Sequence, residues 1–276
     1  MGNESYVDLH THSWYSDGTQ SPAALVQSAL QHNVSTLAIA DHDMLEGSRE
    51  LLALCRNTSI RAIPAVEIDT YEMGINLHVL GYGVDLENPD FNQFVQQTRA
   101  ALDSMNMVLI TAMARDYPQL SVADVTQYTM PQGGGGWLAL HYLLEKGVTS
   151  VLKEGVRFYQ EYRCGYDLAG FPTIAQACDK IHAAGGKAVL AHPGEYVEIS
   201  SDQWEMLVPY FKANGIDGME AYYPTHSNAV RDMLLQLCRR HGLLITCGSD
   251  CHGTFDRTHV GALPMTLEML VLDGIV

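Results

Sequence analysis

The sequence has few basic residues for its length. Lys and Arg together number 16 against 32 Asp and Glu, which gives the 276 residues a formal net charge of −16 at pH 7. Binding to a long nucleic acid depends on cationic side chains that release counterions from the phosphate backbone, and this composition does not favour it. We therefore expect no nucleic-acid polymer as a partner, whereas a small phosphorylated substrate could still approach through bound cations.

Long apolar stretches and closely spaced cysteine pairs are also absent. No run approaches the length of a membrane span, and Gly2, Asn3 and Glu4 stand where a secretory signal would need basic residues. We expect a cytoplasmic protein with no membrane partner. The six cysteines include no Cys-x-x-Cys pair, and we expect reduced core residues rather than disulfides.

Short apolar runs bounded by glycine or polar residues predict buried strands. They span residues 6–9, 36–40, 62–66, 188–191 and 243–247. Helical patterns lie between them: one begins at Ser21 and Pro22, one covers residues 174–181, and one ends before Gly242. This alternation indicates an α/β protein with a parallel sheet. Closure of such a sheet into a barrel would bring the C-terminal ends of its strands to one site.

Histidines and carboxylates follow these predicted strands. His10 and His12 are two residues apart on an extended chain, so both imidazoles point to the same side. Other potential ligands lie at strand ends or in the loops after them, namely Asp17, His42, Glu67, His192, Asp250 and His252. Divalent metals favour mixed imidazole and carboxylate ligands, so the sequence predicts a metalloenzyme.

The middle of the chain interrupts the alternation of strands and helices. Residues 85–172 have a mainly helical pattern, which predicts an inserted cap. Gly133 to Gly136 lack the Lys and Ser or Thr that follow a phosphate-binding glycine loop, so we expect a flexible connector there.

Seven motifs occur in one order along the chain: His10-Thr11-His12, Ser16-Asp17-Gly18, Asp41-His42-Asp43, Ala65-Val66-Glu67, His78, Ala191-His192-Pro193-Gly194 and Gly248-Ser249-Asp250-Cys251-His252. In this combination the chain resembles the polymerase and histidinol phosphatase (PHP) family of metal-dependent phosphoesterases. It looks most like the stand-alone members that act on nucleoside 3′,5′-bisphosphates and the related cyclic phosphodiesterases. The resemblance implies a distorted (β/α)7 barrel formed by residues 1–84 and 173–276, with residues 85–172 as a helical insertion over the active site.

The resemblance also implies three metal sites. His10, His12, Glu67 and Asp250 would hold one ion; Asp17, His42 and His252 a second; and Glu67, His78 and His192 a third, with Glu67 as the bridge. We expect two or three divalent ions, with manganese favoured by the family and iron or zinc also suited to these ligands. Hydrolysis of a phosphate ester would then proceed by attack of a metal-activated hydroxide at phosphorus.

Two residues are assigned to the substrate. Arg157 matches an arginine in the insertion of the stand-alone relatives and would clamp a second phosphate, whereas His226 would bind phosphate or protonate the leaving oxygen. We assign catalysis to Asp250 and His226. The relatives carry a cationic contact where this chain has Gly133 to Gly136, so a cyclic phosphodiester of a sugar phosphate or nucleotide is an alternative to the bisphosphate.

Two hypotheses of other classes stay open. Amidohydrolase barrels also use strand-end histidines and aspartates, so a C–N bond hydrolase is one alternative. An inactive regulatory PHP module is the other, although the complete ligand set argues against it. Histidinol phosphate hydrolysis is less favoured, because those relatives generally have His where Asp17 stands.

Overall fold

The computed structural model describes residues 5–276, and eight strands within this range form two sheets. The first sheet is parallel, with the order β1 (Tyr6–Asp8), β2 (Val34–Ala38) and β3 (Arg61–Ile63). The second has the order β4 (Ala65–Glu72), β5 (Ile75–Tyr82), β6 (Lys187–Leu190), β7 (Gly218–Tyr222) and β8 (Leu244–Cys247). Its β4–β5 and β5–β6 pairs are antiparallel, and the β6–β7 and β7–β8 pairs are parallel.

The two sheets meet at isolated bridges rather than along continuous ladders. Pro64 separates β3 from β4, and a proline cannot donate a ladder hydrogen bond. Single bridges join Thr11 to Cys251 and His42 to Glu67 across the two junctions. The mixed α/β class is therefore confirmed. The ladders of residues 5–276 do not close a barrel, so the seven-stranded barrel stays a prediction.

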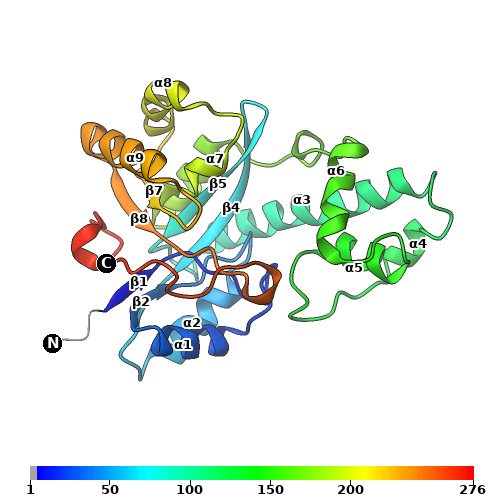
Figure 1. Cartoon of the computed structure of the whole chain (residues 1–276), viewed down its shortest axis with the longest axis horizontal. Helices are drawn as coiled ribbons and strands as arrows, with labels where there is room; N and C mark the ends of the chain where they lie inside the picture. Colours follow the sequence, from blue (N-terminus) through cyan, green and yellow to red (C-terminus); the bar gives the residue numbers. More distant parts are fainter. Residues whose placement is uncertain (1–4) are drawn as a thin grey trace.

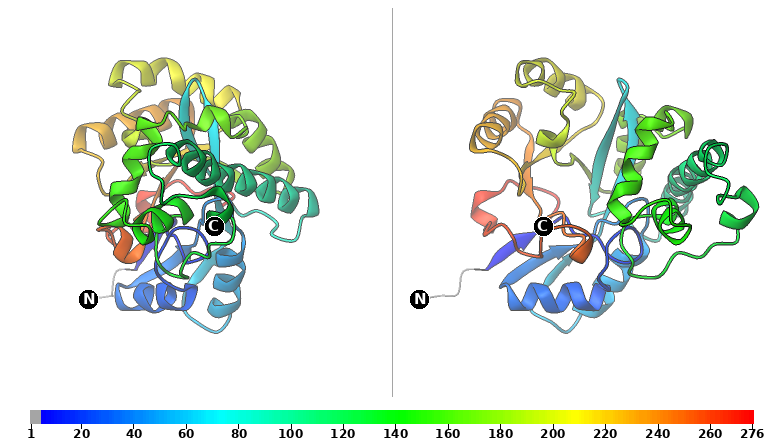
Figure 2. Two further views of the ribbon diagram at one scale, coloured as in Figure 1. Left: turned by 90° about the vertical axis from the view of Figure 1, so that its right-hand side faces the viewer. Right: turned by 45° about the vertical axis from the view of Figure 1, so that its right-hand side comes forward.

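Five helices pack around the sheets (Figures 1 and 2). They are α1 (Pro22–Gln31), α2 (Glu46–Cys55), α7 (Ile174–Ala183), α8 (Ser201–Ala213) and α9 (Asn228–His241). As the sequence predicts, the Ser21 side chain accepts a hydrogen bond from the Ala24 N–H at the start of α1. Gly242 ends α9 with φ +60°, a conformation that suits glycine.

The segment between β5 and β6 is mainly helical, as expected, and projects to one side of the sheets in Figure 1. Its helices are α3 (Pro89–Met113), α4 (Val122–Val125), α5 (Leu138–Glu145) and α6 (Arg157–Glu161), with the 3-10 turns η1 (Leu152–Val156) and η2 (Tyr166–Leu168). Leu109, Ile110, Leu143 and Phe158 form part of a separate apolar cluster within it. Three further 3-10 turns, η3 (Pro193–Glu195), η4 (Gly253–Phe255) and η5 (Leu267–Met269), lie outside this segment.

Most buried side chains of the sheets are apolar, although the carboxylates of Glu67, Asp69 and Glu220 are buried there as well. Val66, Ile68, Val79, Leu190 and Ile245 are among the buried side chains of one large cluster that spans the strands and their covering helices. Burial of this surface provides the main driving force for folding and fixes the strand ends relative to one another. Within residues 5–276, no helix is both long and apolar enough to cross a membrane.

The glycine tract forms a packed contact, so the expected flexible connector is wrong. The Gly136 N–H donates to the Asp17 carbonyl oxygen at 2.8 Å. Gly135 has φ +72°, and a Cβ there would lie 2.7 Å from the Phe255 Cβ and 2.8 Å from the Thr19 Cγ2. Glycine is required both for this backbone conformation and for the close approach of the insertion to the loops near His252.

Replacement of Gly135 should therefore cost more stability than replacement of Gly147, which has φ +68° but no atom within 4 Å of an added Cβ. We expect Gly147→Ala to lower the free energy of unfolding by about 1 kcal/mol through backbone strain. Gly135→Ala should lose about 1–3 kcal/mol more through steric overlap. Urea unfolding of both variants would check this difference, and equal losses would contradict the packed contact.

Candidate metal centre

All nine side chains predicted as metal ligands converge where the two sheets meet. They come from the loop after β1 (His10, His12 and Asp17), the segment after β2 (His42), strands β4 and β5 (Glu67 and His78), the turn after β6 (His192) and the loop after β8 (Asp250 and His252). Because both sheets contribute ligands, the site forms only where the two sheets are brought together.

Glu67 lies at the middle of this cluster and is 1% exposed. Its two oxygens face imidazole nitrogens on all sides. The contacts of Oε2 are 3.2 Å to His10 Nε2, 3.2 Å to His12 Nε2 and 3.3 Å to His42 Nε2, and those of Oε1 are 3.0 Å to His78 Nδ1 and 3.2 Å to His192 Nε2. One oxygen of this carboxylate approaches three histidines and the other approaches two. This is the geometry of a bridge between neighbouring cations.

Asp17 and Asp250 complete the cluster on its other side. Asp17 Oδ2 lies 3.1 Å from His252 Nε2, and its Oδ1 lies 3.5 Å from His12 Nδ1. Asp250 Oδ1 is 3.0 Å from His12 Nε2 and 3.5 Å from His10 Nε2. These aspartates therefore present oxygen atoms to the same imidazoles that Glu67 approaches.

The residues fit divalent metal ions. Four groups have donor atoms within 4.8 Å of one another: His12, Asp17, His42 and His252; His10, His12 and Glu67; His42, Asp69 and His78; and Glu67, His78 and His192. Asp250 Oδ1 and His12 Nδ1 are buried without a hydrogen-bond partner. Buried polar atoms are normally satisfied, and divalent cations bound in the cluster would satisfy these two atoms.

Backbone strain accompanies this placement. Asp43, His192 and Asp250 have positive φ angles of 50°, 27° and 50°, although none of them is glycine. Each lies in a segment that follows a strand. Residues in such conformations cluster at functional sites, where surrounding contacts hold them.

Opposite charges dominate the electrostatics of the cluster. Burial alone would raise the pKa of Glu67, but His42, His10 and His78 hold it well below its usual range. Burial would likewise lower the pKa of His42, yet Glu67, Asp69 and Asp17 raise it to about 9. His252 behaves similarly, since Asp17 and Asp250 raise its pKa to about 10. Without metal ions, protonated histidines therefore balance the buried carboxylates.

Several supporting residues escaped the sequence analysis. The Asp41 oxygens accept from the Ser13 N–H at 2.7 Å and from the Ser16 hydroxyl at 2.6 Å, which fixes the loop between His12 and Asp17. The Tyr223 hydroxyl donates to Asp250 Oδ2 at 2.6 Å. Asp41 lies within a motif that the sequence displays, whereas Tyr223 has no signal because its partner is distant along the chain.

Asp69 and Glu220 were also missed, and both contact histidines of the cluster. Asp69 could have been found, because it lies two residues after Glu67 on the same strand and points to the same face. Glu220 lies on β7, a strand that the apolar runs did not predict.

His226 lies beside the cluster. Its Nε2 accepts a hydrogen bond from the Gly194 N–H at 2.9 Å, and its Nδ1 lies 3.1 Å from the Ala221 carbonyl oxygen. Burial lowers the pKa of His226, which favours a neutral ring with its proton on Nδ1. The ring centroid is 5.2 Å from that of Tyr223, whose hydroxyl reaches Asp250.

Arg157 is not brought to the cluster by any contact among residues 5–276. Its guanidinium pairs with Glu161 Oε1 at 3.4 Å and lies 4.5 Å from the centre of the Phe158 ring. The side chain is exposed on α6. Its assigned role as a phosphate clamp therefore stays a prediction.

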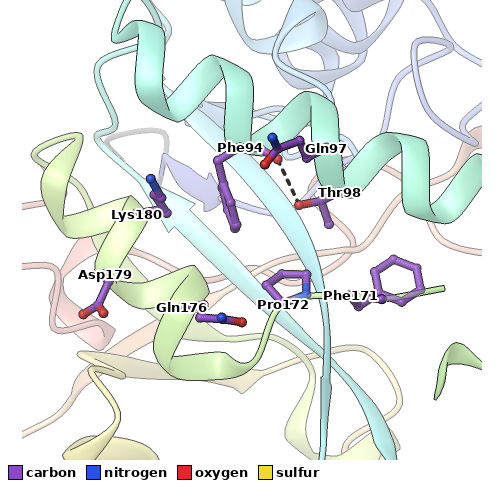
Figure 3. Close-up of a pocket in the computed structure, with 9 residues that line it drawn as sticks. Phe94, Gln97, Thr98, Phe171, Pro172, Gln176, Asp179 and Lys180 are labelled. Atoms are coloured by element: carbon purple, nitrogen blue, oxygen red, sulfur yellow. Dashed lines mark hydrogen bonds between the residues drawn. The ribbon is translucent and has the colours of Figure 1, made fainter. Parts of the chain in front are cut away.

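A pocket between two helices is separate from the metal centre. Figure 3 shows this cavity of about 350 Å³ between α3 and α7, with Phe94, Thr98, Gln176 and Lys180 among its lining residues. It contains none of the nine predicted ligands.

Comparisons with known proteins agree with this geometry. The PHP domain family model matches residues 8–161, more than half of the chain. The 5′-3′ exoribonuclease Rnm of Escherichia coli is 33% identical over 91% of this chain and 88% of its own length. A 3′,5′-nucleoside bisphosphate phosphatase of Chromobacterium violaceum is 26% identical over 94% of this chain and 92% of its own length.

A solved structure shares the fold. It is that of a protein from Bifidobacterium adolescentis assigned as a metal-dependent phosphoesterase. The TM-score is 0.76 at 24% identity, and the alignment covers 96% of this chain and 94% of the other.

The raised pKa values predict how the metal-free protein responds to pH. Between about 6.5, the ordinary pKa of histidine, and the values of about 9 for His42 and about 10 for His252, the folded state binds more protons than the unfolded state. The free energy of unfolding should therefore fall as the pH rises through this range. Urea unfolding of chelator-treated protein at pH 7 and pH 10 would measure the loss, and a higher stability at pH 10 would contradict this electrostatic account.

Proposed function

Since the chain belongs to the PHP domain family and is a metal-dependent phosphoesterase, we propose that it hydrolyses a phosphate ester in a small phosphorylated metabolite or nucleotide. The observation that carries this proposal is the position of Glu67, whose two oxygens approach imidazole nitrogens of five histidines within 3.3 Å. A cluster of this composition suits several divalent cations, and phosphoryl transfer benefits from exactly such a concentration of positive charge.

We assign the ligands to three sites, two of which share Glu67. One set is His10, His12, Glu67 and Asp250; the second is Asp17, His42 and His252; the third is Glu67, His78 and His192. The mutual distances of the donor atoms support each set. Manganese is our proposed metal, because imidazole and carboxylate ligands together suit it better than magnesium, which prefers oxygen donors.

When bound, such ions would activate water for attack at phosphorus and offset the charge on the phosphoryl oxygens. Side chains around the ions would position the ligands and the substrate. The Tyr223 hydroxyl, which donates to Asp250 Oδ2, fixes the rotation of that carboxylate. His226 Nε2 accepts the Gly194 N–H and carries no proton in the neutral ring, so it could protonate the leaving oxygen only after this hydrogen bond is released and Nε2 has taken up a proton. The Gly194 N–H would then be free for an anionic substrate oxygen.

We further propose that residues 1–84 and 173–276 form the catalytic barrel and that residues 85–172 cover its active site. The hydrogen bond from the Gly136 N–H to the Asp17 carbonyl oxygen supports this arrangement, because it joins the insertion to a loop that carries a proposed ligand. The outer part of the insertion has its own apolar cluster, whereas Phe91, Phe94 and Val95 at the start of α3 pack within the cluster of the sheets. The insertion would therefore shape the space available to the substrate.

A nucleotide carrying two phosphates is our first candidate substrate, as the name of the Chromobacterium relative suggests. The 5′ end of a short RNA is a second candidate, favoured by 33% identity to an exoribonuclease over 91% of this chain. This likeness weakens the expectation that no nucleic acid is bound. A cyclic phosphodiester is a third candidate, whereas family membership disfavours a C–N bond hydrolase and an inactive regulatory module.

A substrate panel with manganese-loaded enzyme would test these candidates. It would contain a nucleoside 3′,5′-bisphosphate, a 5′-phosphorylated oligoribonucleotide, a cyclic nucleotide and an amide substrate. We expect hydrolysis of at least one phosphate ester and none of the amide. Cleavage of the amide alone, or no cleavage of any phosphorus ester by metal-loaded protein, would contradict the proposal.

Replacement of the bridging carboxylate should separate metal chemistry from folding. Glu67→Gln keeps the size of the side chain but removes a charge that faces five histidines, so we expect turnover to fall at least about a hundredfold and metal content to decrease. Phosphate or nucleotide release and elemental analysis would measure the two effects. Normal turnover with an unchanged metal content would rule out Glu67 as the bridge.

Substitutions of the two proposed substrate residues should act on different kinetic quantities. We expect Arg157→Ala to raise KM more for a bisphosphate than for a monophosphate, because only the bisphosphate would lose a charge-assisted contact. His226→Asn should lower kcat most for esters with a poor leaving group. Arg115→Ala, which removes another arginine of the inserted segment, is the control. Uniform losses across all substrates would remove both assignments.

A further inference from the structure

Two buried carboxylates lie behind the metal centre and belong to none of the three ligand sets assigned above. Asp69 on β4 is 1% exposed, and Glu220 on β7 is fully buried. Burial of a charged group is costly unless hydrogen bonds compensate for the lost water. The partners of both carboxylates are histidines of the cluster, so their positions have consequences for metal binding.

Asp69 contacts His42 on the nitrogen that faces away from Glu67. The Asp69 Oδ2 lies 3.0 Å from His42 Nδ1, while His42 Nε2 lies 3.3 Å from Glu67 Oε2. A carboxylate can only accept a hydrogen bond, so His42 must carry a proton on Nδ1. The other oxygen of Asp69 lies 3.3 Å from His78 Nε2, so the same carboxylate also contacts the ring of His78.

Glu220 has the same relation to His10. Its two oxygens lie 3.1 Å and 3.2 Å from His10 Nδ1, and His10 Nε2 lies 3.2 Å from Glu67 Oε2. Glu220 Oε2 also accepts the backbone N–H of His192 at 2.9 Å, which supports the unusual φ of +27° at that residue.

Gly248 makes room for this arrangement. A Cβ at residue 248 would lie 2.6 Å from Glu220 Oε1 and 2.1 Å from the Cβ of His10. No other residue type fits against both side chains at once. The backbone of the loop after β8 is therefore shaped around the contact between Glu220 and His10.

We propose that Asp69 and Glu220 are positioning residues that hold the proton of His42 and His10 on Nδ1 and thereby direct Nε2 of both rings to the metal ions. The two carboxylates act through the histidines and do not themselves bind the ions. The inference rests on the proposed metal centre. It also excludes a separate ion held between His42, Asp69 and His78, although their donor atoms lie within 4.8 Å of one another.

The first test uses the unmodified protein loaded with diamagnetic Zn²⁺. Long-range ¹H–¹⁵N correlation spectra distinguish a metal-bound ring nitrogen from a protonated one. We expect His10 and His42 to bind zinc through Nε2 and to carry a proton on Nδ1. Zinc on Nδ1 of either ring, or a mixture of tautomers, would overturn the inference.

The second test uses Asp69→Asn and Glu220→Gln, which keep the size of each side chain. We expect each variant to bind Zn²⁺ about 10–100-fold more weakly in a chelator competition, as is typical when the partner of a ligating histidine is lost. The tautomer signals of the contacted histidine should change in each case. Unchanged affinity in both variants would contradict the proposed role.

Glu72→Gln provides a matched control on the same strand as Asp69. The Glu72 oxygens accept hydrogen bonds from the Tyr210 hydroxyl and the Ile174 N–H rather than from the cluster. We expect its zinc affinity to equal that of the unmodified protein, and an equal loss in all three variants would indicate general damage and overturn the inference. If the unmodified protein binds no zinc, the proposed metal centre fails as well. If the unmodified protein binds zinc and the Asp69 and Glu220 variants bind it with the same affinity, only the positioning role fails.

Discussion

The structure depends on the burial of one carboxylate, that of Glu67, at the junction of its two sheets. The backbone of Glu67 forms an isolated β-bridge with that of His42. The Glu67 N–H donates to the Asp41 carbonyl oxygen at 3.2 Å, and the Glu67 carbonyl oxygen accepts from the Asp43 N–H at 2.9 Å. A buried carboxylate without partners costs several kcal/mol. The surrounding imidazoles offset this cost, so the strands that carry them and the site that they form cannot assemble independently.

The same constraint explains the irregular ends of the strands. His192 and Asp250 reach the cluster from left-handed backbone conformations. The conformation of His192 is stabilised by a hydrogen bond from its N–H to Glu220. That of Asp250 is stabilised by a hydrogen bond from its N–H to the His10 carbonyl oxygen at 2.8 Å. Strain at the ligands is thus balanced by hydrogen bonds from neighbouring strands. The interior apolar packing keeps those strands in place, which links the hydrophobic core directly to the geometry of the metal centre.

The sequence predicted those parts of the site that depend on local periodicity. His10 and His12 could be paired because alternate residues of an extended chain share one face, and the positions of His42, Glu67 and His192 followed from the ends of apolar runs. Glu220 and Tyr223 could not be found in this way, since their partners His10 and Asp250 are far away in the chain. The glycine tract was misjudged for the same reason. Its conformation is dictated by Thr19 and Phe255, which no local pattern connects to it.

The division between sheets and insertion suggests how one centre could serve different phosphate esters. The proposed ligands lie within β4 and β5 and in the segments that follow other strands, so under the proposed function the reacting phosphorus would meet the same surroundings in a monoester, a cyclic diester or the end of an RNA chain. What differs among these substrates is the group attached to the phosphate. That group would extend toward the segment between β5 and β6, where Gly135 and Gly136 pack on Phe255 and the Trp137 Nε1–H donates to the Tyr159 hydroxyl at 2.8 Å. If the insertion covers the active site as proposed, it would govern selectivity, whereas the ligands on and after the strands would govern the catalytic step.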